Sequence, residues 1–278
     1  MNAASDPYLY PGTDVLRNVP GLRKAEQLAA FETAKTAQRI YELQKTPVVG
    51  WFDTTHLKTI HHRVFQDVFP WAGQFRTTML GKAERLGQSP TWFTPPHLLE
   101  HEAQRILDSL HRSDLLLRRI QPIEFARKAA LLLAEINALH PFREGNGRTQ
   151  RLFVDALANQ AGHQLHFDVV SRERMVQASI EANRGNFGMM TRLFEEIIDA
   201  KRIQPLRRAI LFLTRESFNW NDTYIATTIA GENYSGRLVG REGESFMMRL
   251  DDNRILIGRA ADISNSIRTG EQFSFRAT

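Results

Sequence analysis

Apolar residues recur at helical spacing through most of the first 215 residues of the chain. Between Pro122 and Leu139, for example, they fall three and four positions apart, which places them on one face of a helix. The same pattern predicts helices at about 22–46, 54–66, 96–112, 122–139, 147–161, 172–183 and 187–214, the last of them open to a break near Pro205. The first 20 residues are rich in proline, glycine, aspartate and asparagine, and are expected to form an irregular arm.

Two stretches show the alternation that is typical of strands. Residues 74–95 alternate on either side of a turn-like segment at 81–90, which predicts a β-hairpin. From about residue 219 onward, five short strand-like runs are separated by turn residues; they are Tyr224–Ile229, Tyr234–Val239, Ser245–Leu250, Arg254–Ile257 and Gln272–Phe275. We therefore expect an α+β protein, in which a mainly helical bundle with a hairpin precedes a small OB-like β-barrel.

Composition narrows the class of protein without naming a function. The 278 residues are 42% hydrophobic and include no cysteine, which excludes disulfides, zinc–thiolate sites and a cysteine nucleophile. Lysine and arginine number 36 against 31 acidic residues, a net charge of +5, and the basic residues are spread along the chain. No run of 18 apolar residues and no secretory signal is present, so we expect a cytoplasmic protein without a membrane partner. Export by a route with a different signal stays open.

The segment His140 to Arg151 reads HPFREGNGRTQR and concentrates groups that suit nucleotide phosphate chemistry. His140 is the candidate catalytic base, because an imidazole can take a proton from a hydroxyl near neutral pH. Glu144 is the candidate metal ligand, since Mg²⁺ commonly uses one or two carboxylates together with substrate phosphates. The Gly145-Asn146-Gly147 loop can turn consecutive N–H groups toward an anion where a helix begins.

Two arginines complete the predicted nucleotide site. Arg148 and Arg151 are three positions apart and so share a helix face, where guanidinium groups can clamp the distal phosphates. Phe142 is expected to point inward as an apolar anchor beneath the loop. The segment predicted to bind the nucleotide comprises Phe142, Arg143, Gly145, Asn146, Gly147, Arg148 and Arg151.

This segment resembles the signature of the Fic family, which runs His-Pro-Phe, any residue, Asp or Glu, Gly-Asn-Gly-Arg, two residues, Arg. Every specified position is filled. The resemblance implies transfer of AMP from ATP to a Ser, Thr or Tyr hydroxyl of a target protein. In the related Doc kinases the second glycine position is a lysine and the terminal phosphate is transferred, so Gly147 favours nucleotide transfer.

The resemblance covers about residues 20–200 and implies further parts of the architecture. The catalytic domain would occupy 21–200, followed by a helical connector at 201–218 and the barrel at 219–278. Phe69-Pro70-Trp71-Ala72-Gly73, followed by Arg76, is similar to the segment that leads into the flap hairpin of Fic proteins. That flap, at about 74–95, would hold the target in extended form. A Fic domain followed by such a barrel also resembles secreted bacterial Fic effectors.

Several alternatives stay open at this stage. The motif contacts phosphates rather than the base, so a UMP, GMP or phosphocholine donor would suit it equally, and a non-catalytic docking scaffold is a second rival. Thr228–Asn233 matches the letters of a Fic inhibitory helix, but it lies in a strand-rich region and contains a glycine. The favoured alternatives are therefore a separate small antitoxin-like inhibitor chain or no inhibitor at all. Phe246 and nearby arginines could bind single-stranded nucleic acid, but aromatic residues in small barrels more often form the core.

Overall fold

The computed structural model describes residues 6–82, 91–113 and 117–278. They form two compact units. The first comprises residues 1–120 and 132–162, and the second comprises residues 121–131 and 163–278. Helix α5 (Pro122–Leu139) contributes to both units. The domain limits expected at residues 20, 200 and 218 stay a prediction.

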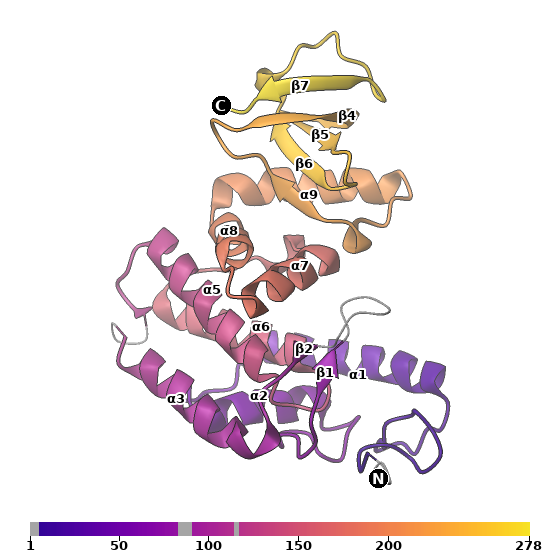
Figure 1. Ribbon diagram of the computed structural model, residues 1–278, viewed down its shortest axis with the longest axis vertical. Helices are drawn as coiled ribbons and strands as arrows, with labels where there is room; N and C mark the ends of the chain where they lie inside the picture. The colour runs from indigo at the N-terminus through magenta and orange to yellow at the C-terminus, as the bar shows by residue number, and fades with distance from the viewer. Residues whose placement is uncertain (1–5, 83–90, 114–116) are drawn as a thin grey trace. The chain divides into compact units, whose positions relative to one another are not determined.

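The first unit is helical, and its helices lie close to the predicted spans. It contains α1 (Ala25–Lys45), α2 (Thr54–Phe65), the 3₁₀ turn η1 (Pro96–Leu98), α3 (Leu99–His111), the end of α5 and α6 (Asn146–Ala161) (Figure 1). Local sequence explains the start of α2, where the Asp53 carboxylate accepts the N–H of His56 at 2.8 Å. Helices α1 and α6 both pack against α2, so α2 lies at the centre of this unit.

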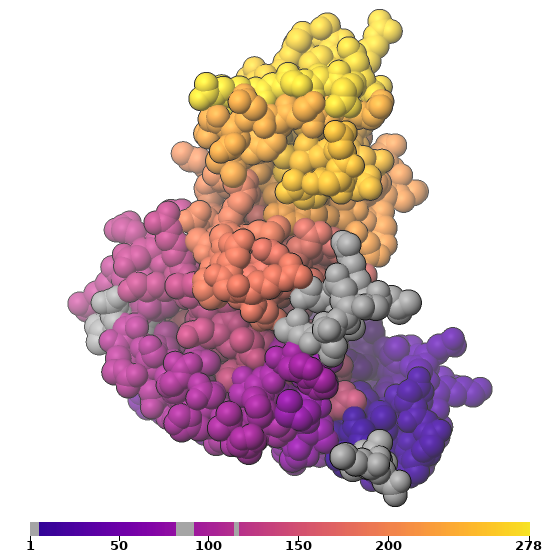
Figure 2. All heavy atoms as spheres, in the orientation of Figure 1, coloured from indigo at the N-terminus to yellow at the C-terminus, as the bar shows by residue number. Residues whose placement is uncertain are grey.

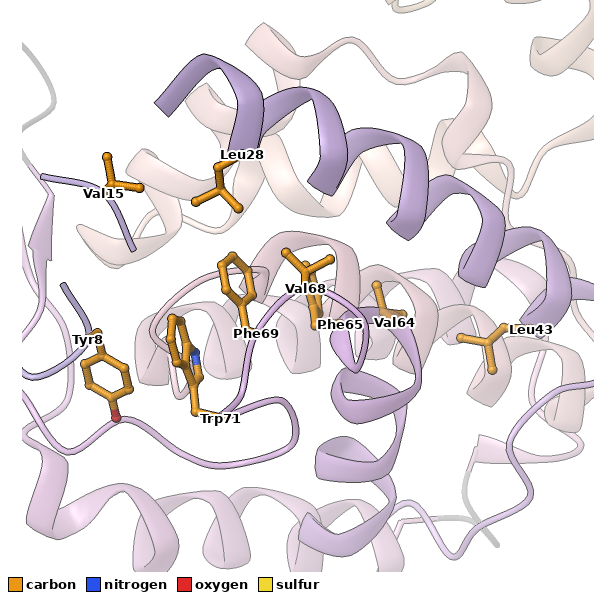
Figure 3. Packing of buried hydrophobic residues seen from close by; sticks show 9 residues of the cluster. All are labelled: Tyr8, Val15, Leu28, Leu43, Val64, Phe65, Val68, Phe69 and Trp71. Carbon is orange, nitrogen blue, oxygen red and sulfur yellow. The ribbon is translucent and has the colours of Figure 1, made fainter. Parts of the chain in front are cut away.

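The irregular N-terminal arm is part of the core of the first unit. Figure 3 shows Tyr8 and Val15 of the arm gathered with side chains from α1, α2 and the loop that follows α2; those side chains are Leu28, Leu43, Val64, Phe65, Val68, Phe69 and Trp71. The ring of Tyr8 meets Trp71 edge-on, with centroids 4.9 Å apart. The arm thus lacks regular structure, as expected, yet buries apolar surface.

The predicted hairpin is present at its base. Strands β1 (Gly81–Lys82) and β2 (Thr91–Trp92) pair antiparallel, with Gly81 opposite Trp92. Of the turn expected at 81–90, residues 81 and 82 belong to strand β1, and residues 83–90 lie outside the described residues. The alternating residues 75–79 do not form a strand, and the carbonyl of Thr78 accepts from the Arg76 side chain at 2.7 Å.

Besides the first part of α5, the second unit contains three helices, α7 (Arg172–Asn183), α8 (Gly188–Ile197) and α9 (Ala200–Arg215), preceded by the 3₁₀ turn η2 (Phe167–Val169). The break in the long helical pattern falls before Ala200 and not near Pro205. Asp199 explains it, because its carboxylate accepts the N–H of Lys201 at 3.0 Å and caps a new helix. Pro205 lies inside α9.

Five strands follow the turn η3 (Trp220–Asp222). They are β3 (Ile225–Thr227), β4 (Asn233–Glu242), β5 (Ser245–Arg249), β6 (Ile255–Arg259) and β7 (Gln272–Arg276), with the 3₁₀ turn η4 (Ala260–Asp262) after β6. All five match predicted runs. Their order is β3-β6-β5-β4-β7, with β3 parallel to β6 and the other pairs antiparallel.

The sheet is open, so the structure does not show the closed barrel that the sequence suggested. Strands β3 and β7 are its edges, and β7, yellow in Figure 2, lies at the surface. Phe246 of β5 is fully buried and its ring packs on Phe273 and Phe275. It is a core residue and cannot serve as a platform on which a nucleic-acid base stacks.

Candidate active site

His140 is the first residue beyond α5 and lies where the helix ends. Its backbone adopts a φ of +46°, the left-handed conformation that terminates many helices, and its N–H still bonds to the carbonyl of Ile136 at 3.2 Å. The imidazole is half-buried. Phe93, which follows β2, stacks on it with ring centroids 3.9 Å apart and planes 13° apart. The His140 imidazole, the candidate general base, is therefore held by Phe93, the residue that directly follows strand β2 of the hairpin.

The loop after His140 closes on itself through Asn146. The Asn146 side chain accepts the N–H of Phe142 at 2.9 Å and donates to the carbonyl of Phe142 at 2.8 Å. Asn146 is buried, and these two bonds satisfy its amide within the loop. Its side chain therefore shapes the loop, while its backbone remains part of the predicted phosphate cradle.

Gly145 introduces α6 with a φ of +81°, a conformation that glycine adopts without strain. A Cβ at this position would lie 2.2 Å from the ring of Phe65, so no larger residue fits. The first bond of the helix runs from Thr149 N–H to the carbonyl of Gly145, at 3.1 Å. The N–H groups of Asn146, Gly147 and Arg148 thus have no partner within the helix, which is the arrangement that binds anions.

Gly147 differs from Gly145 in its backbone conformation. Its φ is not positive, and a Cβ there would meet the Nη1 atom of Arg151 at 3.3 Å. The Arg151 guanidinium therefore lies beside Gly147 at the start of α6. Within the described residues, Arg151 has no hydrogen bond or ion pair, although it is half-buried. Burial is the main cause that lowers the pKa of Arg151, and the charge of Arg148 adds to it.

Arg148 points to α1 and has protein partners. Its Nη2 donates to the carboxylate of Glu32, and its Nη1 donates to the hydroxyl of Thr36 at 3.1 Å. The guanidinium also lies over the ring of Phe65, 4.7 Å from its centroid. The two motif arginines thus share a helix face, as predicted, but only Arg151 is without a partner in the described part of the chain.

The side chains of Glu144 and Arg143 differ in the contacts that they make within the protein. The Glu144 side chain is 45% exposed, and its Oε1 accepts the N–H of Gly145 at 2.9 Å. Arg143 instead donates to the carboxylate of Asp6 in the N-terminal arm, at 2.8 Å. The structure therefore places the Arg143 side chain on the arm, away from the phosphate-binding role that its position in the motif suggested.

His61 of α2 is a site residue that the sequence pattern did not reveal. It is fully buried, and its ring stacks on Phe142 with centroids 3.8 Å apart. Its Nδ1 accepts the N–H of Gly73 at 2.8 Å, so its Nε2 carries the proton and donates to the carbonyl of Glu144 at 3.0 Å. Burial lowers the pKa of His61 to about 4, so it is neutral at pH 7.

Known proteins share both the sequence and the fold of this site. Residues 51–158 match the model of the Fic/DOC family. A Sinorhizobium fredii protein named "Probable protein adenylyltransferase y4lH" is 40% identical over 185 residues, which span 66% of this chain and 92% of that protein. The chain belongs to the Fic/DOC family.

Solved Fic structures extend the comparison. The type IV secretion system effector protein BepA superimposes with a TM-score of 0.87 at 30% identity, covering 97% of this chain and 95% of that chain. The N-terminal Fic domain of a Bep effector from Bartonella quintana, solved with bound ADP, gives a TM-score of 0.63 at 29% identity, covering 71% of this chain and 97% of that chain. The chain spans 46% and 38% of the length of two Bartonella relatives named protein adenylyltransferases.

Proposed function

We propose that this chain is a protein adenylyltransferase, which transfers AMP from ATP to a Ser, Thr or Tyr hydroxyl of a target protein. The observation that carries the proposal is the Arg151 guanidinium, which is half-buried, has no partner among the described residues, and lies beside Gly147 where α6 presents free N–H groups. A buried cation without a protein partner is costly unless a ligand supplies the opposite charge. The triphosphate of ATP supplies it.

His140 would act as the general base in this reaction. It takes the proton of the target hydroxyl, whose oxygen attacks the α-phosphorus of ATP. The new oxygen–phosphorus bond forms as the bond from the α-phosphorus to the bridging oxygen breaks, and pyrophosphate leaves. The α6 N–H groups and Arg151 hold the phosphates in line, so catalysis rests on positioning and charge stabilisation.

The residues around Glu144 fit a bound Mg²⁺. One carboxylate oxygen accepts the Gly145 N–H, and the half-exposed side chain leaves the other available. The described residues contain no cluster of three acidic, histidine or cysteine side chains that could hold a metal alone. That donor set suits Mg²⁺, which completes its shell with water and substrate phosphates and neutralises their charge.

Gly147 supports transfer of the nucleotide rather than of the terminal phosphate. A side chain at this position would meet the Arg151 guanidinium, which we assign to the distal phosphates. The lysine of the Doc kinases would add a second cation at the same place. With glycine, Arg151 can occupy the start of α6 and hold the β- and γ-phosphates as a leaving group.

We propose three further features. The target would add an extended segment to the hairpin at 74–95, where Met79 and Trp92 are exposed. An antitoxin-like chain would inhibit the enzyme, since Thr228–Asn233 forms the turn between β3 and β4 and not an inhibitory helix. The five strands would form a partly open OB-like domain.

We also propose that the protein acts inside a bacterial cell or after delivery into a host cell. The likeness to a type IV secretion system effector supports delivery. No helix in the described ranges is long and apolar enough to span a lipid bilayer.

The decisive experiment labels a cell lysate with α-³²P-ATP, using the wild-type chain beside His140→Ala. We expect wild type to label a protein band and the variant to lose a factor of about 10² to 10⁴ in rate. Binding of α,β-methylene ATP to both proteins checks that the variant still folds. Equal labelling by the variant would remove the role of His140.

Competition and a second label separate the rival activities. Excess unlabelled ATP should suppress the label more than UTP, GTP, CTP or CDP-choline does. If another donor suppresses the label more strongly, the transferred group is the one that this donor carries and not AMP. Label that enters from γ-³²P-ATP instead would indicate phosphate transfer. Nucleotide binding without any transfer would favour a docking scaffold.

A further inference from the structure

Arg76 is among the most deeply buried side chains of the protein, with 2% of its surface exposed. Its guanidinium donates to four backbone carbonyls, those of Leu139, His140, Thr78 and Thr94, at 2.5 to 3.2 Å. The backbone N–H of Arg76 donates to the carbonyl of Pro141 at 2.8 Å. All of these acceptors are neutral, so Arg76 is a buried cation that has no carboxylate among these partners.

The four carbonyls belong to two segments, the end of α5 and the residues that flank the hairpin strands. The proposed reaction requires these segments to be correctly positioned relative to each other. Leu139 is the last residue of α5, and His140, the candidate base, follows it directly. Thr78 precedes strand β1 of the hairpin, and Thr94 follows strand β2. Carbonyls at the C-terminus of a helix attract a cation. A planar guanidinium can span several acceptors at fixed angles, which a lysine ammonium cannot do.

Burying this charge is expensive, and burial lowers the pKa of Arg76. An apolar side chain could fill the same volume, but it would leave these four carbonyls without the donors that Arg76 supplies. The hydrogen bonds of Arg76 therefore connect two segments of the chain, which filling the volume alone would not require. They link the segments that flank the hairpin strands to the end of α5, next to the imidazole of His140.

We propose that Arg76 is a positioning residue, which fixes the hairpin relative to His140 and so places the target hydroxyl against the base. This role rests on the proposed adenylyl transfer. Arg76 contacts none of the groups assigned to the phosphates, which are the start of α6 and Arg151. It acts on the step that involves the target and not on nucleotide binding.

The test compares Arg76→Lys with Arg39→Lys, a control that changes another multiply bonded arginine, whose partners are Asp67 and Glu42. Initial rates of ³²P incorporation into the main labelled lysate protein are measured against ATP concentration. We expect Arg76→Lys to lose about tenfold to a hundredfold in rate at saturating ATP, with its KM for ATP within about twofold of wild type. Arg39→Lys should behave like wild type.

A double-mutant cycle asks whether Arg76 acts through His140. In a His140→Ala background, Arg76→Lys should cost less than about threefold, because the base that it positions is gone. An equal loss in both backgrounds, or a loss of ATP affinity that accompanies the loss of rate, would overturn the assignment in favour of a structural role.

Hydrogen exchange decides the assignment even without transfer. The N–H of Phe93 bonds to Leu80, and that of Thr94 bonds to Ala138. In Arg76→Lys these two amides should exchange faster, while the amides of α1 and α2 keep their protection. If wild type labels no protein, the proposed function fails; unchanged exchange at Phe93 and Thr94 would instead refute the role of Arg76.

Discussion

Phe93 lies flat against the imidazole of His140, with 3.9 Å between the ring centroids. Because Phe93 directly follows β2, this stack joins the hairpin to the candidate base. Phe93→Leu keeps an apolar side chain but loses the flat face, so we expect the chain to fold and the transfer rate to fall about tenfold.

Labelling of lysate with α-³²P-ATP measures the effect of Phe93→Leu. Phe167→Leu is the matched control, since Phe167 packs edge-on against Phe194 in the second unit. Equal losses in the two variants would mean that the stack does not orient His140.

Arg151 and Arg148 should respond oppositely to neutralisation. Arg151→Gln removes a half-buried charge that has no partner in the described residues, so the nucleotide-free protein should melt at the wild-type temperature or above it. Arg148→Gln breaks the ion pair with Glu32 and should lower the melting temperature by about 3–6 °C, from a loss of about 1–2 kcal/mol.

Nucleotide binding completes that comparison. Added α,β-methylene ATP should raise the melting temperature of wild type and leave Arg151→Gln unmoved. A destabilised Arg151→Gln protein that still binds the analogue would show that Arg151 serves the fold and not the phosphates.

The two glycines of the loop should differ in what they tolerate. Gly145→Ala combines a left-handed backbone with a Cβ only 2.2 Å from Phe65, so we expect a loss of about 3 kcal/mol or failure to fold. Gly147→Ala meets only the flexible end of Arg151, so stability should change by less than about 1 kcal/mol while affinity for the nucleotide falls. Urea unfolding and calorimetric titration measure the two effects, and equal destabilisation would contradict the structure.

His61 should make the fold sensitive to acid. Its pKa is about 4 in the folded protein against 6.5 ordinarily, so the unfolded chain binds the proton more readily. Stability contributed by neutral His61 is complete above about pH 6.5 and declines as the pH falls toward 4, by up to about 3 kcal/mol. Urea unfolding across this range should show a flatter profile for His61→Gln than for wild type.

His62→Gln provides the control for that profile, because His62 is next to His61 in the chain and is exposed. This variant should keep the slope of wild type. If His61→Gln keeps it as well, the buried imidazole is not the group that titrates.

Local patterns sufficed for most elements and for the motif. The helix predicted at 122–139 has the observed bounds because its apolar period is regular and Pro122 and Pro141 flank it. The break at Asp199 was missed because a cap depends on one hydrogen bond, whereas Pro205 is conspicuous in any sequence. Closure of the sheet could not be inferred, since five strand-like runs do not specify how their edges meet.

The site shows the same division between local and distant information. Motif spacing indicated which residues gather at the start of α6, but the partners of Arg143 and Arg148 come from Asp6 and Glu32, more than 100 positions away. His61 was missed for the same reason. Its role depends on contacts with Gly73 and Glu144, and nothing in the residues beside it signals them.

The ring that Asn146 closes with Phe142 has a kinetic consequence. Since these bonds are made within the protein, the loop holds its shape before any nucleotide arrives, and binding need not wait for it to fold. Association should then be governed by diffusion and by the attraction between the triphosphate and the positive start of α6, and it should slow as salt screens that attraction.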